Sequence, residues 1–264
     1  MKRNQSDCDD RAPVALRGYA DVANHFDPAD AMAVLPMGAD GVVNAAEICC
    51  DRHAADDLRV ALRHRSPCGQ TSDLTFAELK RRSAQFAQVL AGLGVRKGDR
   101  VASLLPRTPE LLITMFATWR LGAVYQPLFT AFGPKAIEHR LELAETRAIV
   151  IDVANRPKLS ELAVSIPIVT VAAAADTQDH DFWRTLDAQT GLLDPVACTM
   201  DDPFLMMFTS GTTGLPKPLF IPVRAIAAFI GYMRDAVGLR EDDRFWNIAD
   251  PGWAYGLYYA VTGP

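Results

Sequence analysis

Residues 204–217 read FLMMFTSGTTGLPK, an apolar run followed by a loop of small and polar residues. The loop, from Thr209 to Lys217, carries four hydroxyl groups, two glycines and one lysine. Glycine lets backbone amides turn toward an anion, hydroxyls add rotatable donors, and lysine adds a positive charge. This composition is suited to binding a polyphosphate. The loop is not a Walker-type P-loop, which needs adjacent glycine and lysine, because two residues separate Gly214 from Lys217.

Apolar, strand-like segments flank this loop on both sides. A helix N-terminus, which binds the anion in the usual nucleotide loops, is therefore not expected here. We expect affinity to come from backbone amides, the hydroxyls and Lys217. Lys217 lies between two prolines, and Pro218 favours extended backbone at the lysine. The alternative is a hairpin loop that only joins two strands.

The overall composition fits a globular protein. The chain has 264 residues, of which 49% are hydrophobic and 22% charged, enough apolar material for a core. The formal net charge of −5 and the absence of a long basic run argue against a nucleic-acid partner. The longest apolar runs, such as residues 225–233, are too short to span a bilayer, so no transmembrane segment is predicted.

Cysteine and histidine usage indicates neither a disulfide framework nor a metal site. The five cysteines form no CxxC pair, and reduced thiols in a cytoplasmic protein explain them most simply. The five histidines are scattered without metal-ligand spacing. The sequence therefore predicts a cytoplasmic location and no bound metal among these side chains, and it leaves the oligomeric state open.

Helix and strand patterns alternate along the chain. Thr75 and Glu78 have capping-box spacing, Thr108 is a second N-cap candidate, and Gly94 and Gly122 supply helix stops. The predicted helices are 45–53, 76–93, 109–121, 134–144 and 222–237, and the predicted strands are 101–105, 124–129, 148–151, 166–171, 204–208, 219–221 and 244–248.

This order predicts the fold class. Continuously apolar strands that alternate with helices indicate an α/β fold with a largely parallel sheet and helices on both faces. Residues 1–40 show weak periodicity and are predicted to be a loosely ordered lead-in. Residues 41–264 are predicted to form the α/β part.

Residues 209–217 resemble the signature of the AMP-binding, adenylate-forming enzymes, which comprise acyl- and acetyl-CoA synthetases, luciferases and peptide-synthetase adenylation domains. Further segments, in the same order along the chain, are similar to the acetyl/acyl-CoA synthetase branch: residues 44–46, 51–53, 75–79, 98–102, 121–124, 132–134 and 249–253. The resemblance covers residue 42 to the end. It implies that residues 41–264 are the N-terminal portion of an AMP-binding domain, corresponding to the first half of its large domain.

The resemblance implies ATP-dependent activation of a carboxylic acid. The carboxylate attacks the α-phosphorus of Mg-ATP, pyrophosphate leaves, and coenzyme A then displaces AMP to give a thioester. The implied partners are a small carboxylic acid, ATP, Mg²⁺ and coenzyme A. The residues implied to bind the β- and γ-phosphates are Thr209, Ser210, Gly211, Thr212, Thr213, Gly214 and Lys217. The family usually has glycine after the lysine, whereas this chain has Pro218, which lacks an amide donor.

An acyl pocket is implied at Trp253, Ala254, Tyr255 and Gly256, just after a turn-forming Asp-Pro-Gly. From residue types alone, the alternative is an aromatic core cluster, because further tyrosines follow closely. Leu257 stands where acetyl-CoA synthetases commonly carry histidine, which departs from the acetate pattern.

A coenzyme A contact is implied at Thr130, Ala131 and Arg156. In acetyl-CoA synthetases a glycine pair after a phenylalanine and a downstream arginine contact this cofactor. Here Thr130 and Ala131 replace the glycines. The alternative for Arg156 is an exposed, solvated side chain.

Several elements of the family pattern do not occur before Pro264. These are the adenine- and magnesium-contacting motif, the ribose-binding aspartate, the hinge and the C-terminal domain with the catalytic lysine. No catalytic residue is therefore predicted in this portion, and the chain alone is expected to be inactive, as a fragment or a truncated gene product. The alternative is a non-catalytic nucleotide-binding or interaction module derived from such a ligase.

Overall fold

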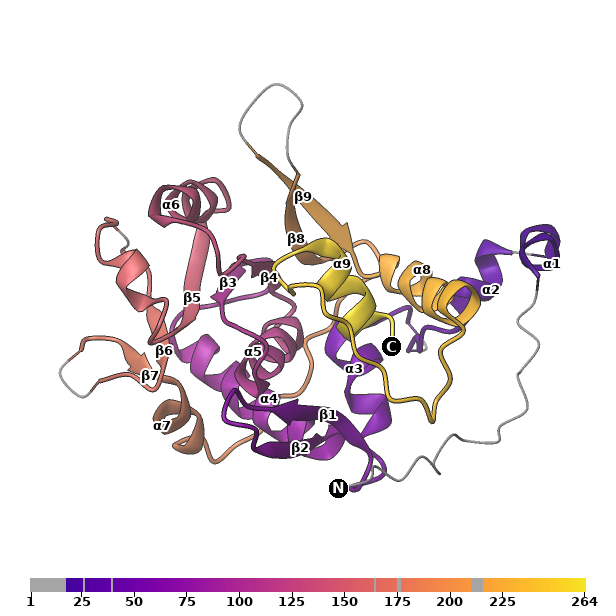
Figure 1. The fold of residues 1–264 in the computed structure, drawn as a ribbon, viewed down its shortest axis with the longest axis horizontal. Helices are drawn as coiled ribbons and strands as arrows, with labels where there is room; N and C mark the ends of the chain where they lie inside the picture. The colour runs from indigo at the N-terminus through magenta and orange to yellow at the C-terminus, as the bar shows by residue number, and fades with distance from the viewer. Residues whose placement is uncertain (1–17, 26, 39, 164, 175–176, 210–215) are drawn as a thin grey trace, which may run out of the picture.

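The computed structural model describes residues 18–25, 27–38, 40–163, 165–174, 177–209 and 216–264. In this part of the chain, seven strands form one sheet in the order β7-β6-β5-β3-β4-β8-β9 (Figure 1). They are β3 (Arg100–Leu104), β4 (Val124–Pro127), β5 (Thr146–Asp152), β6 (Ile168–Val171), β7 (His180–Asp181), β8 (Pro203–Thr209) and β9 (Lys217–Pro222). Neighbours pair in parallel except β8 and β9, which are antiparallel. The predicted largely parallel sheet is confirmed.

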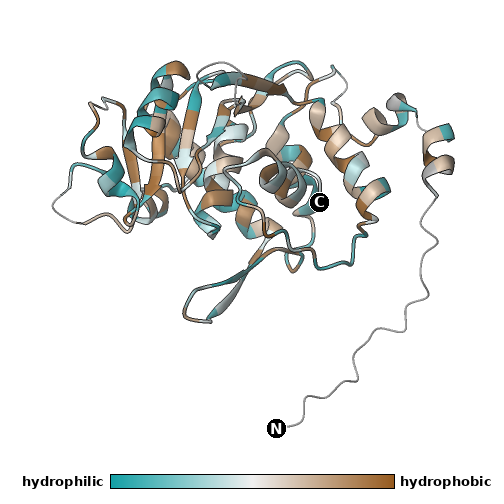
Figure 2. Cartoon of the chain, turned by 45° about the horizontal axis from the view of Figure 1, so that its top comes forward, coloured by the Kyte–Doolittle hydropathy of each residue, from teal (hydrophilic) through white to brown (hydrophobic). Residues whose placement is uncertain are grey.

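Helices cover both faces of this sheet. One core cluster joins Val101 and Val150 to α4 and α5, and a second joins Ala102 and Ile149 to α6 on the opposite face. Figure 2 shows the strands as mainly hydrophobic segments within the body of the molecule. The helices are α3 (Ala45–Cys49), α4 (Phe76–Gly92), α5 (Pro109–Arg120), α6 (Pro134–Leu143), α7 (Phe182–Asp187), α8 (Ala225–Tyr232) and α9 (Ala254–Leu257). None of the helices in the described ranges has the length and hydropathy that a membrane crossing requires.

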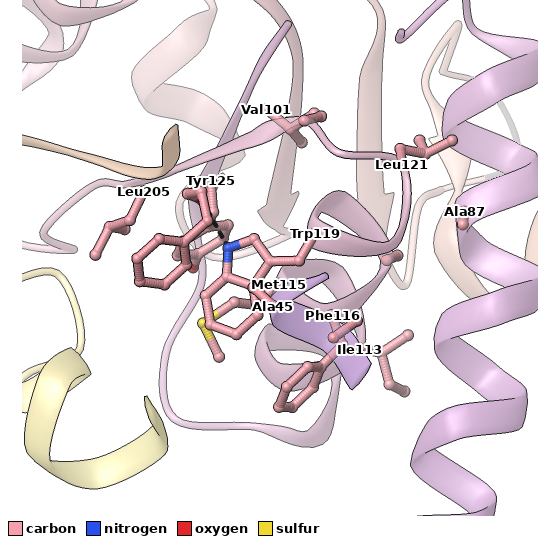
Figure 3. Close-up of a cluster of buried hydrophobic side chains, with 14 of the residues drawn as sticks. Ala45, Ala87, Val101, Ile113, Met115, Phe116, Trp119, Leu121, Tyr125 and Leu205 are labelled. Atoms are coloured by element: carbon pink, nitrogen blue, oxygen red, sulfur yellow. Dashed lines mark hydrogen bonds between the residues drawn. The ribbon is translucent and has the colours of Figure 1, made fainter. Parts of the chain in front are cut away.

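Trp119 of α5 belongs to the core cluster that packs against β4 and β8. Its side chain is buried, and its indole Nε1 donates to the Phe204 carbonyl of β8 at 2.7 Å. Its ring lies edge-on to Phe116 at 5.3 Å and to Tyr125 of β4 at 6.5 Å between centroids (Figure 3). Because buried N–H groups need acceptors, this contact fixes α5 against the start of β8.

The predicted helix ends are mostly confirmed. The Glu78 amide donates to Thr75 Oγ1 at 3.1 Å, and the Ala46 amide donates to Asn44 Oδ1 at 2.8 Å, which are N-cap bonds. Gly94 has a φ of 90° and Gly122 a φ of 65°. This left-handed backbone, which glycine adopts without steric cost, ends α4 and α5 where the sequence indicated.

Two predicted elements are wrong. Residues 244–248 form no strand, and Trp246 and Ile248 are 79% and 73% exposed. A segment with large apolar side chains forms a strand only when a neighbour pairs with it, and this segment passes over the surface instead. The predicted helix 45–53 is interrupted at Cys50, whose φ of −135° is not helical. A 3₁₀ turn, η1 (Asp51–His53), follows it.

Other elements were not predicted. β1 (Val60–Arg65) and β2 (Thr71–Thr75) form a separate antiparallel pair. Two short helices, α1 (Tyr19–His25) and α2 (Pro28–Ala33), lie in the lead-in. The predicted helix 222–237 consists of α8 followed by a π-helical turn, η3 (Met233–Val237), whereas the π-helical turn η4 (Tyr258–Thr262), which follows α9, was not predicted. The 3₁₀ turn η2 (Arg156–Leu159) follows β5.

Candidate functional site

The predicted phosphate loop lies at the end of an antiparallel hairpin. Thr209, the last residue of β8, is paired in register with Lys217, the first residue of β9, and Thr209 Oγ1 donates to the Lys217 carbonyl at 3.5 Å. Both side chains are exposed. Lys217 makes no ion pair with any residue that the structure describes. Ser210, Gly211, Thr212, Thr213 and Gly214 lie outside the described residues.

The setting of the hairpin matches the expectation for the loop. Strands, not a helix, flank it: Leu205 pairs with Ile221, and Phe208 pairs with Pro218. Pro218 lies on β9, which is the last strand of the sheet, and an edge strand tolerates a residue that lacks an amide donor. The Lys217 backbone is therefore held extended while its ammonium group is free of described partners.

The predicted acyl-pocket segment packs against the turn that follows β4. The Trp253 ring lies 5.5 Å from the Phe129 ring and 6.4 Å from the Phe132 ring, and its side chain remains half exposed. A Cβ on Gly252 would lie 2.6 Å from Phe129 Cα, and a Cβ on Gly256 would lie 2.2 Å from the Asp250 carbonyl oxygen. Only glycine fits such close approaches.

Tyr255 belongs to a different group of rings. It is 54% exposed and lies 5.0 Å from the Tyr259 ring. Tyr259 in turn contacts Tyr232 of α8 at 4.3 Å, and Phe229 stacks on Tyr258 at 4.2 Å. The aromatic cluster that residue types alone suggest is thus present. It takes in Tyr255 and leaves Trp253 to a second cluster with Phe129 and Phe132.

The coenzyme A candidates are only partly brought together. Thr130 and Ala131 lie in the turn closed by the Phe132 amide, which donates to the Phe129 carbonyl at 2.9 Å. They are therefore next to the Trp253 cluster. Lys158 of η2 donates to the Thr130 carbonyl and to Asn155 Oδ1. Sequence reasoning did not single out Lys158, although it stands two residues after the arginine that it did.

Arg156 is already engaged with an aspartate. Its Nη2 donates to Asp179 Oδ1 at 2.9 Å, and its Nε donates to Oδ2 at 2.5 Å. Asp179 also accepts from Thr170 Oγ1 at 2.7 Å. The Arg156 guanidinium holds the pKa of the Asp179 carboxyl below its usual range. The observed role of Arg156 is therefore structural, because its ion pair with Asp179 links η2 to the segment before β7.

Three of the segments that carry predicted site residues follow the carboxyl ends of parallel strands. Thr209 ends β8, the Phe129 turn follows β4, and η2 follows β5. Ligands of open α/β sheets bind at this edge. A hollow of about 310 Å³ lies near the ends of β3 and β5, beside Thr108 and Asp152. None of the predicted site residues that the structure describes lines it.

The residues that the structure describes hold no group of three His, Cys, Asp or Glu side chains able to bind a metal ion. Four of the cysteines lie in the described part, as free thiols: Cys49, Cys50, Cys68 and Cys198. Burial raises the pKa of the Cys49 thiol to about 12, so this thiol is protonated at neutral pH in the metal-free protein.

The fold is an α/β domain with a mainly parallel sheet and a lysine-bearing antiparallel hairpin at its edge. The sequence profile of the AMP-binding enzymes matches residues 45–264. The chain belongs to the AMP-binding enzyme family.

Similar proteins place it near the acyl-CoA synthetases of that family. A crystal structure of a Brucella canis acyl-CoA synthetase superposes with a TM-score of 0.87 at 49% identity, covering 93% of this chain and 45% of that one. Acetyl-coenzyme A synthetases from Bacillus subtilis and Streptomyces coelicolor are 32% and 33% identical, covering 94% and 85% of this chain. The chain spans 45% and 38% of the length of these two relatives.

Proposed function

We propose that this chain provides the phosphate-binding portion of an ATP-dependent acid–CoA ligase. The observation that carries the proposal is the pairing of Thr209 with Lys217 at the carboxyl edge of the sheet. In support, Lys217 has no ion-pair partner among the described residues and directly follows a stretch of sequence rich in hydroxyls and glycines. That arrangement suits an anion with several oxygens.

In the proposed reaction, a carboxylate oxygen of the acid attacks the α-phosphorus of ATP. The bond from that phosphorus to the bridging oxygen breaks, and pyrophosphate leaves with the electron pair. Coenzyme A sulfur then attacks the acyl carbon, its proton is lost, and AMP leaves to give the thioester. Negative charge grows on pyrophosphate in the first step, and positioned donors stabilise it. Lys217, Thr209 and the loop hydroxyls would supply these donors.

The Mg²⁺ of the reaction is proposed to arrive bound to ATP, where it would neutralise phosphate charge. The described residues form no cluster of ligands that could hold it by themselves. The part of this chain is therefore to bind and orient the phosphate end of the nucleotide.

The acid and coenzyme A are proposed to bind beside the two aromatic clusters. Trp253, Ala254, Tyr255 and Gly256 would border the acyl group. Thr130 and Ala131, whose turn is held by Lys158, would border coenzyme A. Arg156 could join them only by loosening its pair with Asp179. The reaction is proposed to take place in the cytoplasm, in keeping with the free thiols of the described cysteines.

Acid-dependent exchange of labelled pyrophosphate into ATP tests the proposal. We expect exchange by the full-length product of the gene when a carboxylic acid and Mg²⁺ are supplied, and none when the acid is omitted. The chain of 264 residues should show no exchange by itself. Failure of the full-length product to exchange with any acid of a broad panel would reject the ligase function and favour a non-catalytic binding module.

Tyr255→Gly is expected to shift acid preference toward larger acids. The exposed Tyr255 ring would otherwise occupy space beside the acyl group, and a difference of one methylene in such a pocket changes kcat/KM by roughly tenfold or more. The measurement is kcat/KM for a series of straight-chain acids of increasing length.

The matched control is Trp246→Ala, which removes another exposed aromatic ring, 79% exposed, outside both clusters. It should leave the ranking of acids unchanged. The same ranking for Tyr255→Gly and the unaltered enzyme would show that Tyr255 does not border the acid.

A further inference from the structure

Arg140 lies between two aromatic rings that come from different parts of the chain. It belongs to the last turn of α6, and its guanidinium carbon lies 4.1 Å from the Phe132 ring centroid and 5.4 Å from the Phe208 ring centroid. Its Nη1 donates to the Ala136 carbonyl at 2.8 Å. The side chain is partly buried and makes no ion pair with a described residue.

Each of the two rings is adjacent to one candidate site, the phosphate hairpin or the Trp253 cluster. Phe208 immediately precedes Thr209 and pairs with Pro218, so it lies at the loop end of the phosphate hairpin, which is formed by β8 and β9. Phe132 closes the turn after β4, and its ring lies 6.4 Å from the Trp253 ring. The rings and the guanidinium thus form a continuous row from Trp253 through Phe132 and Arg140 to Phe208, which we name the ring–cation row.

The contacts of the ring–cation row can help to hold the hairpin and the Trp253 cluster in a fixed arrangement. A cation over an aromatic face changes an equilibrium by roughly two- to fivefold when exposed and by roughly thirtyfold or more when desolvated. Partial burial lowers the pKa of Arg140, yet a guanidinium remains charged at neutral pH. Its planar group can stack on both rings, which an ammonium does less well.

The strand pairing alone leaves the hairpin weakly tied to the sheet. β8 pairs with β4 through Tyr125 and Leu205, near the start of β8, and its residues beyond Leu205 pair with the edge strand β9 alone. Phe208 also packs against Val124, Ala144 and Met206. The contact with Arg140 adds to this packing on the part of β8 that the pairing with β4 does not reach.

We propose that Arg140 is a positioning residue that holds the loop end of the phosphate hairpin at a fixed orientation relative to the Trp253 cluster. This rests on the proposed ligase function, because the orientation matters when phosphates and acid must meet at one phosphorus atom. Arg140 touches neither ligand in this proposal. It acts through Phe208 on Thr209 and Lys217, and through Phe132 on Trp253.

The test compares Arg140→Ala and Arg140→Lys with Lys135→Ala, which removes an exposed cation from the same helix. In pyrophosphate exchange by the full-length product, we expect Arg140→Ala to raise KM for ATP and for pyrophosphate roughly tenfold, which lies between the effect of losing an exposed and a desolvated cation–ring contact, as suits a partly buried arginine. Arg140→Lys should lie between this variant and the unaltered enzyme, and Lys135→Ala should match the latter.

A merely structural arginine would change stability but not these constants in the folded enzyme. Unchanged KM values for ATP and pyrophosphate in Arg140→Ala, in an enzyme whose unaltered form is active, would overturn the positioning role and leave the ligase function standing. A uniform fall in kcat with all KM values unchanged would overturn it as well.

Amide hydrogen exchange separates this inference from the ligase function, since it needs no activity. In Arg140→Ala the amides of Thr209 and Lys217 should exchange roughly tenfold faster, while that of Ile149 in β5 stays unchanged. Equal rates at Thr209 and Lys217 in the two proteins would overturn the inference even if the unaltered enzyme is an active ligase. If the full-length product is inactive but these amides exchange faster in Arg140→Ala, the ligase function is rejected. The inference that Arg140 holds the hairpin is then retained.

Discussion

Lys217→Ala is expected to lower kcat/KM for ATP by roughly a hundredfold, because a hydrogen bond to a charged group contributes about 1.5–3 kcal/mol. Lys217 makes no ion pair with a described residue, so its removal should leave no buried carboxylate unpaired and should not unfold the protein. The loss should therefore fall on phosphate binding. Pyrophosphate exchange and ATP saturation curves of the full-length product measure it.

Two comparisons sharpen this prediction. Lys217→Arg keeps the charge and should recover part of the loss, and Lys135→Ala, an exposed lysine on α6, should have no effect. KM for the acid should change much less than KM for ATP. If Lys217→Ala keeps its dependence on ATP and on added pyrophosphate, the lysine is not a phosphate ligand.

Asp51→Ala is expected to lower the free energy of unfolding by about 3–5 kcal/mol, the usual cost of removing one partner of a buried ion pair. Asp51 Oδ1 and Oδ2 accept from Arg120 Nη2 and Nη1 at 2.7 and 3.0 Å. The two side chains are only 10% and 2% exposed. Without the aspartate, the Arg120 charge would remain buried with Ser83 as a single hydroxyl partner. Urea unfolding followed by circular dichroism measures the change.

Asp73→Ala is the matched control, because its partner Arg63 is 53% exposed and the aspartate 41% exposed. Such surface pairs contribute about 0–1 kcal/mol. Replacing both buried partners, as Asp51→Leu with Arg120→Met, should restore much of the loss, since no charge is then left unpaired. A loss below about 1 kcal/mol for Asp51→Ala would contradict the assignment of a buried pair.

Much of the fold follows from local signals in the sequence. Thr75 with Glu78 marks the start of α4, and Gly94 and Gly122 mark the ends of two helices, because capping and left-handed backbone depend on neighbouring residues only. The parallel sheet follows from continuously apolar strands such as Ala148–Ile151, where β5 lies. These signals need no knowledge of distant contacts.

The wrong and missing elements depend on contacts between distant residues. Residues 244–248 carry large apolar side chains that resemble those of a strand, but no neighbouring strand pairs with them. β1 and β2 carry many polar side chains, and only their mutual pairing identifies them. Cys50 ends α3 because the chain turns to place Asp51 against Arg120. Such pairings are invisible to periodicity.

The candidate site likewise has features that the local sequence indicates and features that depend on contacts between distant residues. The loop composition indicates the anion, and the structure places its two described ends opposite each other. The sequence could not indicate that Trp253 lies against Phe129, that Lys158 reaches Thr130, or that Arg140 lies beside Phe208. Each of these contacts joins residues that are far apart in the chain, so no local sequence pattern indicates it.

The pairing of Thr209 with Lys217 also bears on the entropy of ligand binding. The free energy needed to bring the two ends of a loop together grows with the logarithm of its length. Because β8 and β9 already hold these ends in register, folding has met that cost before any nucleotide arrives. Substitutions that weaken the β8–β9 ladder, far from any phosphate, would transfer the cost to binding. They would appear as lower nucleotide affinity without the loss of a single ligand contact.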